Sequence, residues 1–189
     1  MAPHATSSPR REQLLQAAYL YVLEHGLSEL SLRPLAQAIG SSPRVLLFLF
    51  DSKDGLIKAL LARARVEERA LIDELRAADA ATMPAVANRI WQWLAATEHR
   101  GLLVLWSESY ARSLVGPHGP WRGFASATVE DWLQLLADAQ PPELRDTPQA
   151  LAERTLVLAF LRGALLDLLA TGDQRRITSA VQLAIGATA

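Results

Sequence analysis

The histidines are the side chains best able to act as general bases or metal ligands, and they lie far apart in the sequence. His4, His25, His99 and His118 form no pair at the i, i+4 spacing that would place two ligands on one helix face. His118 lies in a Gly/Pro-rich segment, residues 116–120, and is interpreted as a loop residue rather than a base. The sequence contains no G-x-S-x-G motif and no glycine-rich phosphate loop. These patterns predict neither an enzyme, nor a metal site, nor a cofactor.

The composition is that of an ordinary globular protein. Its 189 residues fit one domain of usual size, or a small domain joined to a larger one, and half are hydrophobic. The absence of cysteine excludes disulfides, thiol catalysis and thiolate metal sites, and a net charge of -1 gives no global basic field. No apolar stretch approaches the roughly 18 residues needed to span a bilayer, and the first residues do not resemble a secretory signal. We expect a cytoplasmic protein without a membrane partner, with a disordered tail over residues 1–9.

Signals for helix starts and ends recur along the whole chain, and no strand pattern is present. Ser42 and Ser52, for example, stand where N-caps of the third and fourth helices are expected. We predict an all-α fold of about nine helices, with one block at residues 10–53 and a larger one at residues 54–189, linked by the helix at 53–78. The predicted helices cover residues 10–25, 32–39, 43–50, 53–78, 84–97, 100–115, 120–139, 148–170 and 174–186.

The third predicted helix contains an uninterrupted apolar run, residues 45–50. Ser42 and Pro43 before it are a capping residue and a first-turn proline, so the run continues a helix rather than forming a buried strand. A longer helix followed by two short ones, the last two joined by a tight turn at residues 40–42, matches a helix-turn-helix, in which the third helix lies in the major groove of DNA. The helical period predicts that Leu46 and Phe50 face the first two helices. It places four other residues on the outward face: Pro43, Arg44, Leu47 and Phe48.

A set of residues at fixed offsets extends from the first helix to the start of the fourth: Arg11, Leu15, Ala17, Ala18, Gly26, Ser31, Leu35, Ala36, Gly40, Ser42, Leu46, Phe50, Ser52, Lys53 and Leu56. At these positions, residues 10–57 resemble the DNA-binding domain of the TetR family of transcriptional regulators. The long connecting helix and the five helical segments after it agree with the architecture of that family. The resemblance implies a helix-turn-helix DNA-binding domain at 10–53 and a ligand-binding and dimerisation domain at 54–189.

The resemblance also implies which residues contact double-stranded DNA. Ser42 and Lys53 are expected at phosphates, and Arg33 and Arg44 are expected at bases. An arginine can pair with the O6 and N7 atoms of guanine, although a solvated surface side chain is the alternative for both arginines. The outward-facing residues of the third helix complete the predicted DNA-binding set: Arg33, Ser42, Pro43, Arg44, Leu47, Phe48 and Lys53.

One segment departs from the family pattern. The family usually has Leu-Tyr-x-His-Phe where residues 46–50 of this chain are Leu-Leu-Phe-Leu-Phe. Leu47 and Leu49 thus replace a tyrosine and a histidine that bind the DNA backbone. Apolar groups can touch thymine methyls or sugars, but they donate no hydrogen bond to a phosphate. We expect weak or unusually selective DNA binding. Two alternatives stay open: Leu49 is buried, or the protein has lost DNA binding and acts by protein contact.

All five tryptophans lie between residues 91 and 132. Large aromatic residues can simply fill a helical core, but together they also resemble the lining of an apolar ligand site. The family resemblance implies an effector pocket in this region, and we expect a small apolar or aromatic effector. The predicted pocket residues are Trp91, Trp106, Ser109, Tyr110, Trp121 and Phe124, and the polar candidates beside them are Asn88, Glu108, Arg112, Arg122 and Arg162.

Two apolar stripes near the C-terminus contain small residues that would let helices approach closely. They suit a two-fold homodimer built as a four-helix bundle, although a stripe of the protein's own core is the alternative. The family resemblance implies a bacterial repressor that a small effector releases from a palindromic operator. The predicted interface residues are Leu158, Arg162, Leu165, Leu166, Val181 and Ile185.

Overall fold

The computed structural model describes residues 8–28, 30–77, 82–116 and 118–187. Within these ranges the chain forms nine α-helices and two 3-10 helices and contains no strand, which confirms the predicted all-α fold. In chain order the elements are α1 (Pro9–His25), α2 (Leu32–Ala38), α3 (Pro43–Phe50), α4 (Lys53–Ala77), α5 (Met83–Leu94), η1 (Thr97–His99), α6 (Arg100–Val115), η2 (Gly119–Trp121), α7 (Phe124–Asp138), α8 (Pro148–Thr171) and α9 (Gln174–Ala187). None of the described helices is long and apolar enough to cross a membrane.

Serine caps and first-turn prolines fix the starts of α1 and α3. The Ser8 hydroxyl oxygen accepts a hydrogen bond from the backbone N–H of Arg11 at 3.2 Å, and Ser42 caps α3 in the same way. The first helix therefore begins at Pro9, one residue before the predicted start. Residues 1–7 of the predicted tail lie outside the described residues.

The three-helix block α1–α3 packs directly on α4. Leu35, Leu46 and Leu60 are almost completely buried where these helices meet, in one continuous core that extends to α9. The hydroxyl of Tyr19 on α1 donates a hydrogen bond to the carboxylate of Glu67 on α4 at 2.7 Å. Burial, with this bond, raises the pKa of Tyr19 above its ordinary value. The N-terminal block is thus attached to α4 by both apolar and polar contacts.

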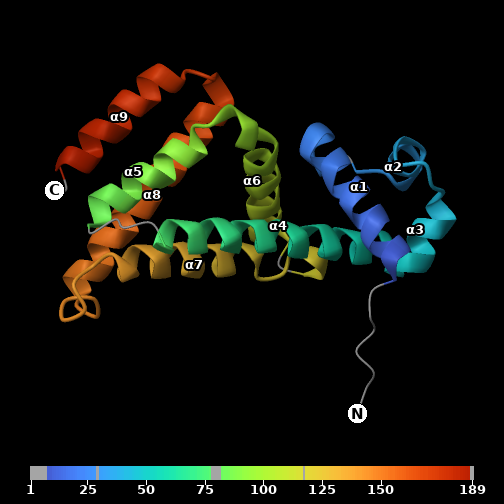
Figure 1. Cartoon of the computed structure of the whole chain (residues 1–189), viewed down its shortest axis with the longest axis horizontal. Coiled ribbons are helices and arrows are strands. Elements are labelled where there is room, and N and C mark those ends of the chain that lie inside the picture. Colours follow the sequence, from blue (N-terminus) through green and yellow to red (C-terminus); the bar gives the residue numbers. More distant parts are fainter. Residues whose placement is uncertain (1–7, 29, 78–81, 117, 188–189) are drawn as a thin grey trace, which may run out of the picture.

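The larger block surrounds the far part of α4. Figure 1 shows α4 lying along α7, α5, α8 and α9 gathered at the end opposite α1–α3, and α6 standing between the two ends. Two boundaries differ from the sequence prediction by more than one residue because short 3-10 helices interrupt the chain. The fifth helix ends at Leu94, before η1, and the seventh begins at Phe124, after η2 and after Gly123, whose φ of 72° is left-handed.

Candidate functional site

The outward face of α3 is apolar at its centre. Phe48 is 83% exposed and Leu47 is 42% exposed, whereas Leu46 and Phe50 are buried against the rest of the three-helix block. Arg44 is also exposed, and Pro43 is half-buried. The division into an inner and an outer face is the one that the helical period predicts.

Three cations accompany this face. Arg33 on α2, Arg44 on α3 and Lys53 at the start of α4 are exposed, and none of them forms an ion pair with another described residue. The Ser42 oxygen accepts the capping hydrogen bond from Val45 N–H at 3.3 Å, which leaves its own O–H proton available as a donor. These groups can therefore bind an external anion without breaking an existing ion pair.

Leu49 differs from Leu47 in its surroundings. The Leu49 side chain is partly buried and packs against the core, and its carbonyl oxygen accepts a hydrogen bond from Arg11 Nε at 3.3 Å. The Arg11 guanidinium also lies 4.8 Å from the ring centre of Phe50. Of the two leucines that depart from the family pattern, Leu47 lies on the surface and Leu49 contributes to packing.

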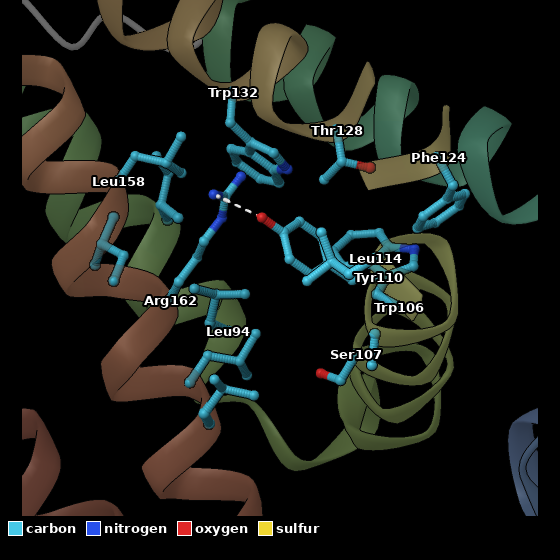
Figure 2. A pocket seen from close by; sticks show the side chains of 15 residues that line it. Leu94, Trp106, Ser107, Tyr110, Leu114, Phe124, Thr128, Trp132, Leu158 and Arg162 are labelled. Carbon is cyan, nitrogen blue, oxygen red and sulfur yellow. Dashed lines mark hydrogen bonds between the residues drawn. The ribbon is translucent and has the colours of Figure 1, made fainter. Parts of the chain in front are cut away.

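A second feature is an apolar cavity of about 340 Å³ between α5, α6, α7 and α8, a volume within the usual range of small-molecule sites. Figure 2 shows its aromatic wall and Arg162 reaching across from α8 towards Tyr110. Leu114 and Leu166, which also line it, are mostly exposed, so the cavity meets the surface beside them. The lining residues are Ile90, Leu94, Trp106, Ser107, Tyr110, Ala111, Leu114, Phe124, Thr128, Trp132, Leu158, Leu161, Arg162, Leu165 and Leu166.

Three of the six predicted pocket residues line this cavity: Trp106, Tyr110 and Phe124. The other three lie elsewhere, each for a local reason. The Trp91 indole N–H donates to the Thr178 hydroxyl on α9 at 3.1 Å, and the Ser109 hydroxyl donates to the Leu105 carbonyl at 2.6 Å within α6. Trp121 belongs to η2, which packs on α4.

The predicted list of pocket residues omits two lining residues of α7, Thr128 and Trp132, although Trp132 is one of the five clustered tryptophans. Together with Phe124 they recur at intervals of four residues, so all three lie on one helix face. Of the polar candidates only Arg162 lines the cavity. The four-residue spacing on α7 was the available signal for this wall.

Most of the predicted dimer residues lie in the cavity wall or in the core of one chain. Leu158, Arg162 and Leu165 line the cavity, and Val181 and Ile185 are buried because α9 packs on α5 and α8. Of the predicted set only Leu166 is mostly exposed, at 58%. The outer face of α8 and α9 instead carries Leu156, Ala159, Gly163, Leu166 and Leu183, all exposed.

A buried carboxylate lies behind the cavity wall. Glu68 on α4 has no exposed surface and accepts hydrogen bonds from the Trp132 indole N–H at 2.7 Å and from Arg65, which also pairs with Asp131 on α7. Burial raises the pKa of Glu68, while Arg65 and the Trp132 N–H oppose this rise. A side chain that lines the cavity is thereby bonded to the helix that leads into α1–α3.

A second carboxylate joins α6 to the turn after α1. Glu108 accepts hydrogen bonds from the backbone N–H of Leu27 and from the Ser28 hydroxyl, both at 2.6 Å. The two helices approach so closely at Gly101 that an added Cβ atom would lie 2.4 Å from the Leu23 carbonyl oxygen. The helix that carries Trp106 and Tyr110 into the cavity is therefore held against the three-helix block.

Within the described ranges, no group of three His, Cys, Asp or Glu side chains is placed to hold a metal ion. The described residues thus form an exposed helix α3 accompanied by cations without ion pairs, and an internal apolar cavity. Helix α6 lines the cavity and contacts α1, and α4 contacts α3 and is bonded to the lining residue Trp132.

Comparison with solved structures identifies the fold as that of TetR-family transcriptional regulators. A transcriptional regulator from Rhodococcus sp. is similar with a TM-score of 0.75 and 22% identity, over 94% of this chain and 95% of that chain. A TetR transcription regulator from Haloarcula marismortui gives 0.72 and 20%, over 94% and 95%. The multidrug binding protein EbrR, complexed with imidazole, gives 0.65 and 23%, over 98% and 97%. No protein-family model and no curated protein matches the sequence.

The bond between Trp132 and Glu68 predicts a pH-dependent stability defect. In Trp132→Phe the carboxyl loses a donor, so its pKa rises further. A carboxyl whose pKa is higher in the folded than in the unfolded protein contributes stability at low pH that is lost as the pH rises. The lost bond should cost about 1–3 kcal/mol of unfolding free energy, more at about pH 8 than at about pH 5.

Denaturant unfolding at the two pH values measures this difference. Trp91→Phe is the matched control, because its indole bonds to the neutral Thr178 hydroxyl and its loss should not vary with pH. If the loss of unfolding free energy varies with pH to the same extent in both variants, the Trp132 N–H does not stabilise the charged form of Glu68.

Proposed function

We propose that the chain is a transcriptional regulator that binds double-stranded DNA through α3 and changes its DNA affinity when a small molecule occupies the cavity. The observation that carries the proposal is the position of α6. Its Trp106 and Tyr110 side chains line the cavity, while its Glu108 carboxylate binds the turn between α1 and α2. In the form expected of the TetR family, the protein is a cytoplasmic repressor that an apolar or aromatic effector releases from its operator.

The proposed DNA surface combines two kinds of contact. Arg33 and Arg44 are exposed cations that can pair with guanine edges, and Lys53 and the Ser42 hydroxyl can bind phosphates. Leu47 and Phe48 offer only apolar contact, to thymine methyls or to sugars. We therefore expect the phosphate grip to come mainly from residues outside the centre of α3.

The link from cavity to DNA is proposed to run through two helices. A ligand that displaces Tyr110 or Trp106 would move α6 and, through Glu108, the turn after α1. A ligand that displaces Trp132 would disturb Glu68 on α4, whose first residue is Lys53. Either shift would change the position of α3 and hence the DNA affinity, provided that the ligand binds one arrangement better than the other.

The proposal is tested with gel mobility shifts on the DNA upstream of the protein's own gene and with tryptophan fluorescence in a small-molecule screen. EbrR, a structural relative, is a multidrug binding protein complexed with proflavin, which supports screening aromatic compounds first. A salt-sensitive complex that weakens when a quenching compound is added is the expected result. Absence of any salt-sensitive complex up to micromolar protein would contradict DNA binding.

A second candidate is a protein of this fold that binds another protein through α3 instead of DNA. The 83% exposure of Phe48, beside Leu47, favours it because an exposed apolar patch commonly marks a protein contact. The three unpaired cations around the patch favour DNA instead. Retention on heparin that is lost with added salt would favour the DNA proposal.

We further propose a homodimer, with an interface that shares only Leu166 with the predicted residues. The exposed stripe of Leu156, Ala159, Gly163 and Leu166 on α8, with Leu183 on α9, suits close packing against a second copy about a two-fold axis. Two α3 helices related by such an axis would bind a palindromic site.

Gly163→Arg tests this interface. An added Cβ at Gly163 meets no atom within 4 Å, so the substitution should leave the fold of one chain intact while blocking close helix approach. Sedimentation should show a dimer for the parent and for the Gly163→Ala control, and a monomer with unchanged helical circular dichroism for Gly163→Arg. A Gly163→Arg dimer would place the interface elsewhere.

Arg44 and Lys53 are expected to act differently on DNA. Arg44→Ala should relax the base preference and cost about 1–3 kcal/mol at the operator. Lys53→Ala should weaken binding to all DNA sequences alike. It should also make the slope of log affinity against log salt concentration shallower by about 0.9 per subunit. Binding-site selection and a salt titration measure the two effects. An unchanged selected sequence for Arg44→Ala would make Arg44 a surface residue only.

The two leucines that depart from the family pattern predict opposite effects. Leu47→Tyr adds a hydroxyl at an exposed position and should tighten operator and random DNA alike by about 0.5–1.5 kcal/mol per subunit. Leu49→His places a polar ring against the core and should lower the unfolding free energy by about 1–3 kcal/mol. Affinity and thermal melting are measured for both variants. Weaker operator binding by Leu47→Tyr, with random DNA unaffected, would mean that Leu47 reads a base.

A further inference from the structure

The polar groups of the cavity indicate which class of ligand it accepts. Among the described residues that line it, Arg162 is the one charged side chain, and no aspartate or glutamate is present. The wall is otherwise aliphatic and aromatic, with the small polar groups of Ser107, Thr128 and Tyr110. A guanidinium stays protonated under all ordinary conditions, so the cavity carries a fixed positive charge.

The Arg162 guanidinium makes few and weak interactions within the protein. Its Nη1 donates to the Tyr110 hydroxyl at 3.5 Å, the outer limit for a hydrogen bond, and its central carbon lies 5.2 Å from the Tyr110 ring centre. Its Nη2 is buried without a hydrogen-bond partner among the described residues. A guanidinium nitrogen that is buried without a partner is unfavourable, and an anion that accepts a hydrogen bond from it removes this cost.

Two acids beside the lining residue Trp132 are already engaged. Glu68, behind Trp132, accepts from that indole and from Arg65, and Asp131 pairs with Arg65 and Arg69. They therefore do not serve as partners for Arg162. The Trp106 indole N–H, which belongs to another lining residue, is also buried without a described partner. Both unsatisfied groups are donors, so a complementary ligand must bring acceptors.

We propose that the cavity selects an organic acid: a carboxylate that pairs with Arg162, attached to an apolar or aromatic body. The two N–H groups of a guanidinium edge match the two oxygens of a carboxylate. The body of the ligand lies against Trp106, Tyr110, Phe124 and Trp132. Figure 2 shows Trp132 and Tyr110 beside the Arg162 guanidinium and the other two rings beyond Tyr110. The inference rests on the proposed function only for its regulatory meaning, since the charge preference belongs to the cavity itself.

Isothermal titration calorimetry without DNA tests the charge preference directly. Three probes share one aromatic body and differ in charge: naphthaleneacetate, naphthaleneacetamide and naphthylethylamine. We expect the acetate to bind about 10- to 100-fold more tightly than the neutral amide, because charge-assisted hydrogen bonds are stronger than neutral ones. The amine should bind most weakly. Octanoate with octanamide repeats the comparison for an aliphatic body.

Variants of Arg162 then test whether this side chain causes the preference for a carboxylate. Arg162→Met should bind acetate and amide equally, and Arg162→Lys should keep part of the preference because it keeps the charge but not the planar edge. Arg112→Met, which removes an exposed cation from α6 outside the cavity, is the control for net charge and should behave as the parent. Thermal melting confirms that each variant is folded.

Three results would overturn the proposal: equal affinity of the parent for acetate and amide, a preference that survives Arg162→Met, or no binding of either carboxylate. Failure of the proposed function looks different. A carboxylate that binds through Arg162 while no DNA complex forms would leave the organic-acid site intact and remove its regulatory role.

Discussion

The structure depends on the contact through which Glu108 holds α6 against the three-helix block. The carboxylate accepts two short hydrogen bonds, from the Leu27 N–H and the Ser28 hydroxyl, at a point far from both residues in the sequence. Without it the Leu27 N–H would lose its partner, at a cost of about 1–3 kcal/mol if it stayed buried. Because Trp106 and Tyr110 lie on the same helix, the contact also fixes where the cavity stands relative to α3.

The second connection has a different physical character. Glu68 is a fully buried carboxylate, and its burial is compensated by the ion pair with Arg65 and the hydrogen bond from the Trp132 N–H. Buried polar networks of this kind tolerate few arrangements, since a partly satisfied network is costly. A cavity wall bonded to such a group can therefore convert a small displacement of Trp132 into a rearrangement of α4.

Local signals made the helices and the two faces of α3 predictable. Ser42 and Pro43 determine the start of α3 by themselves, and the spacing of Leu46 and Phe50 determines its inner face. The charged second half of α4 is typical of a solvated face, yet Glu68 in that segment is buried because α7 covers it. No local pattern carries that information.

The cavity and the dimer surface were predictable in region but not in detail. Helix α8 is apolar nearly all round, so its sequence does not distinguish the side that faces the cavity, at Leu158, from the exposed side, at Leu156. Trp91 and Trp132 likewise look alike in sequence, and only the packing of α9 on α5 directs Trp91 away from the cavity.

The central claim, that the cavity and the three-helix block communicate through α6, is tested by the effect of a ligand on operator affinity. The ligand is the aromatic compound that binds most tightly in the tryptophan-fluorescence assay. The operator dissociation constant is measured with and without this compound, in the parent and in Glu108→Ala, and the ratio of the two constants is compared. The account predicts a ratio of about 5 to 150 in the parent and a ratio closer to one in the variant, with the compound bound equally well by both. An undiminished ratio in a folded Glu108→Ala protein would contradict it.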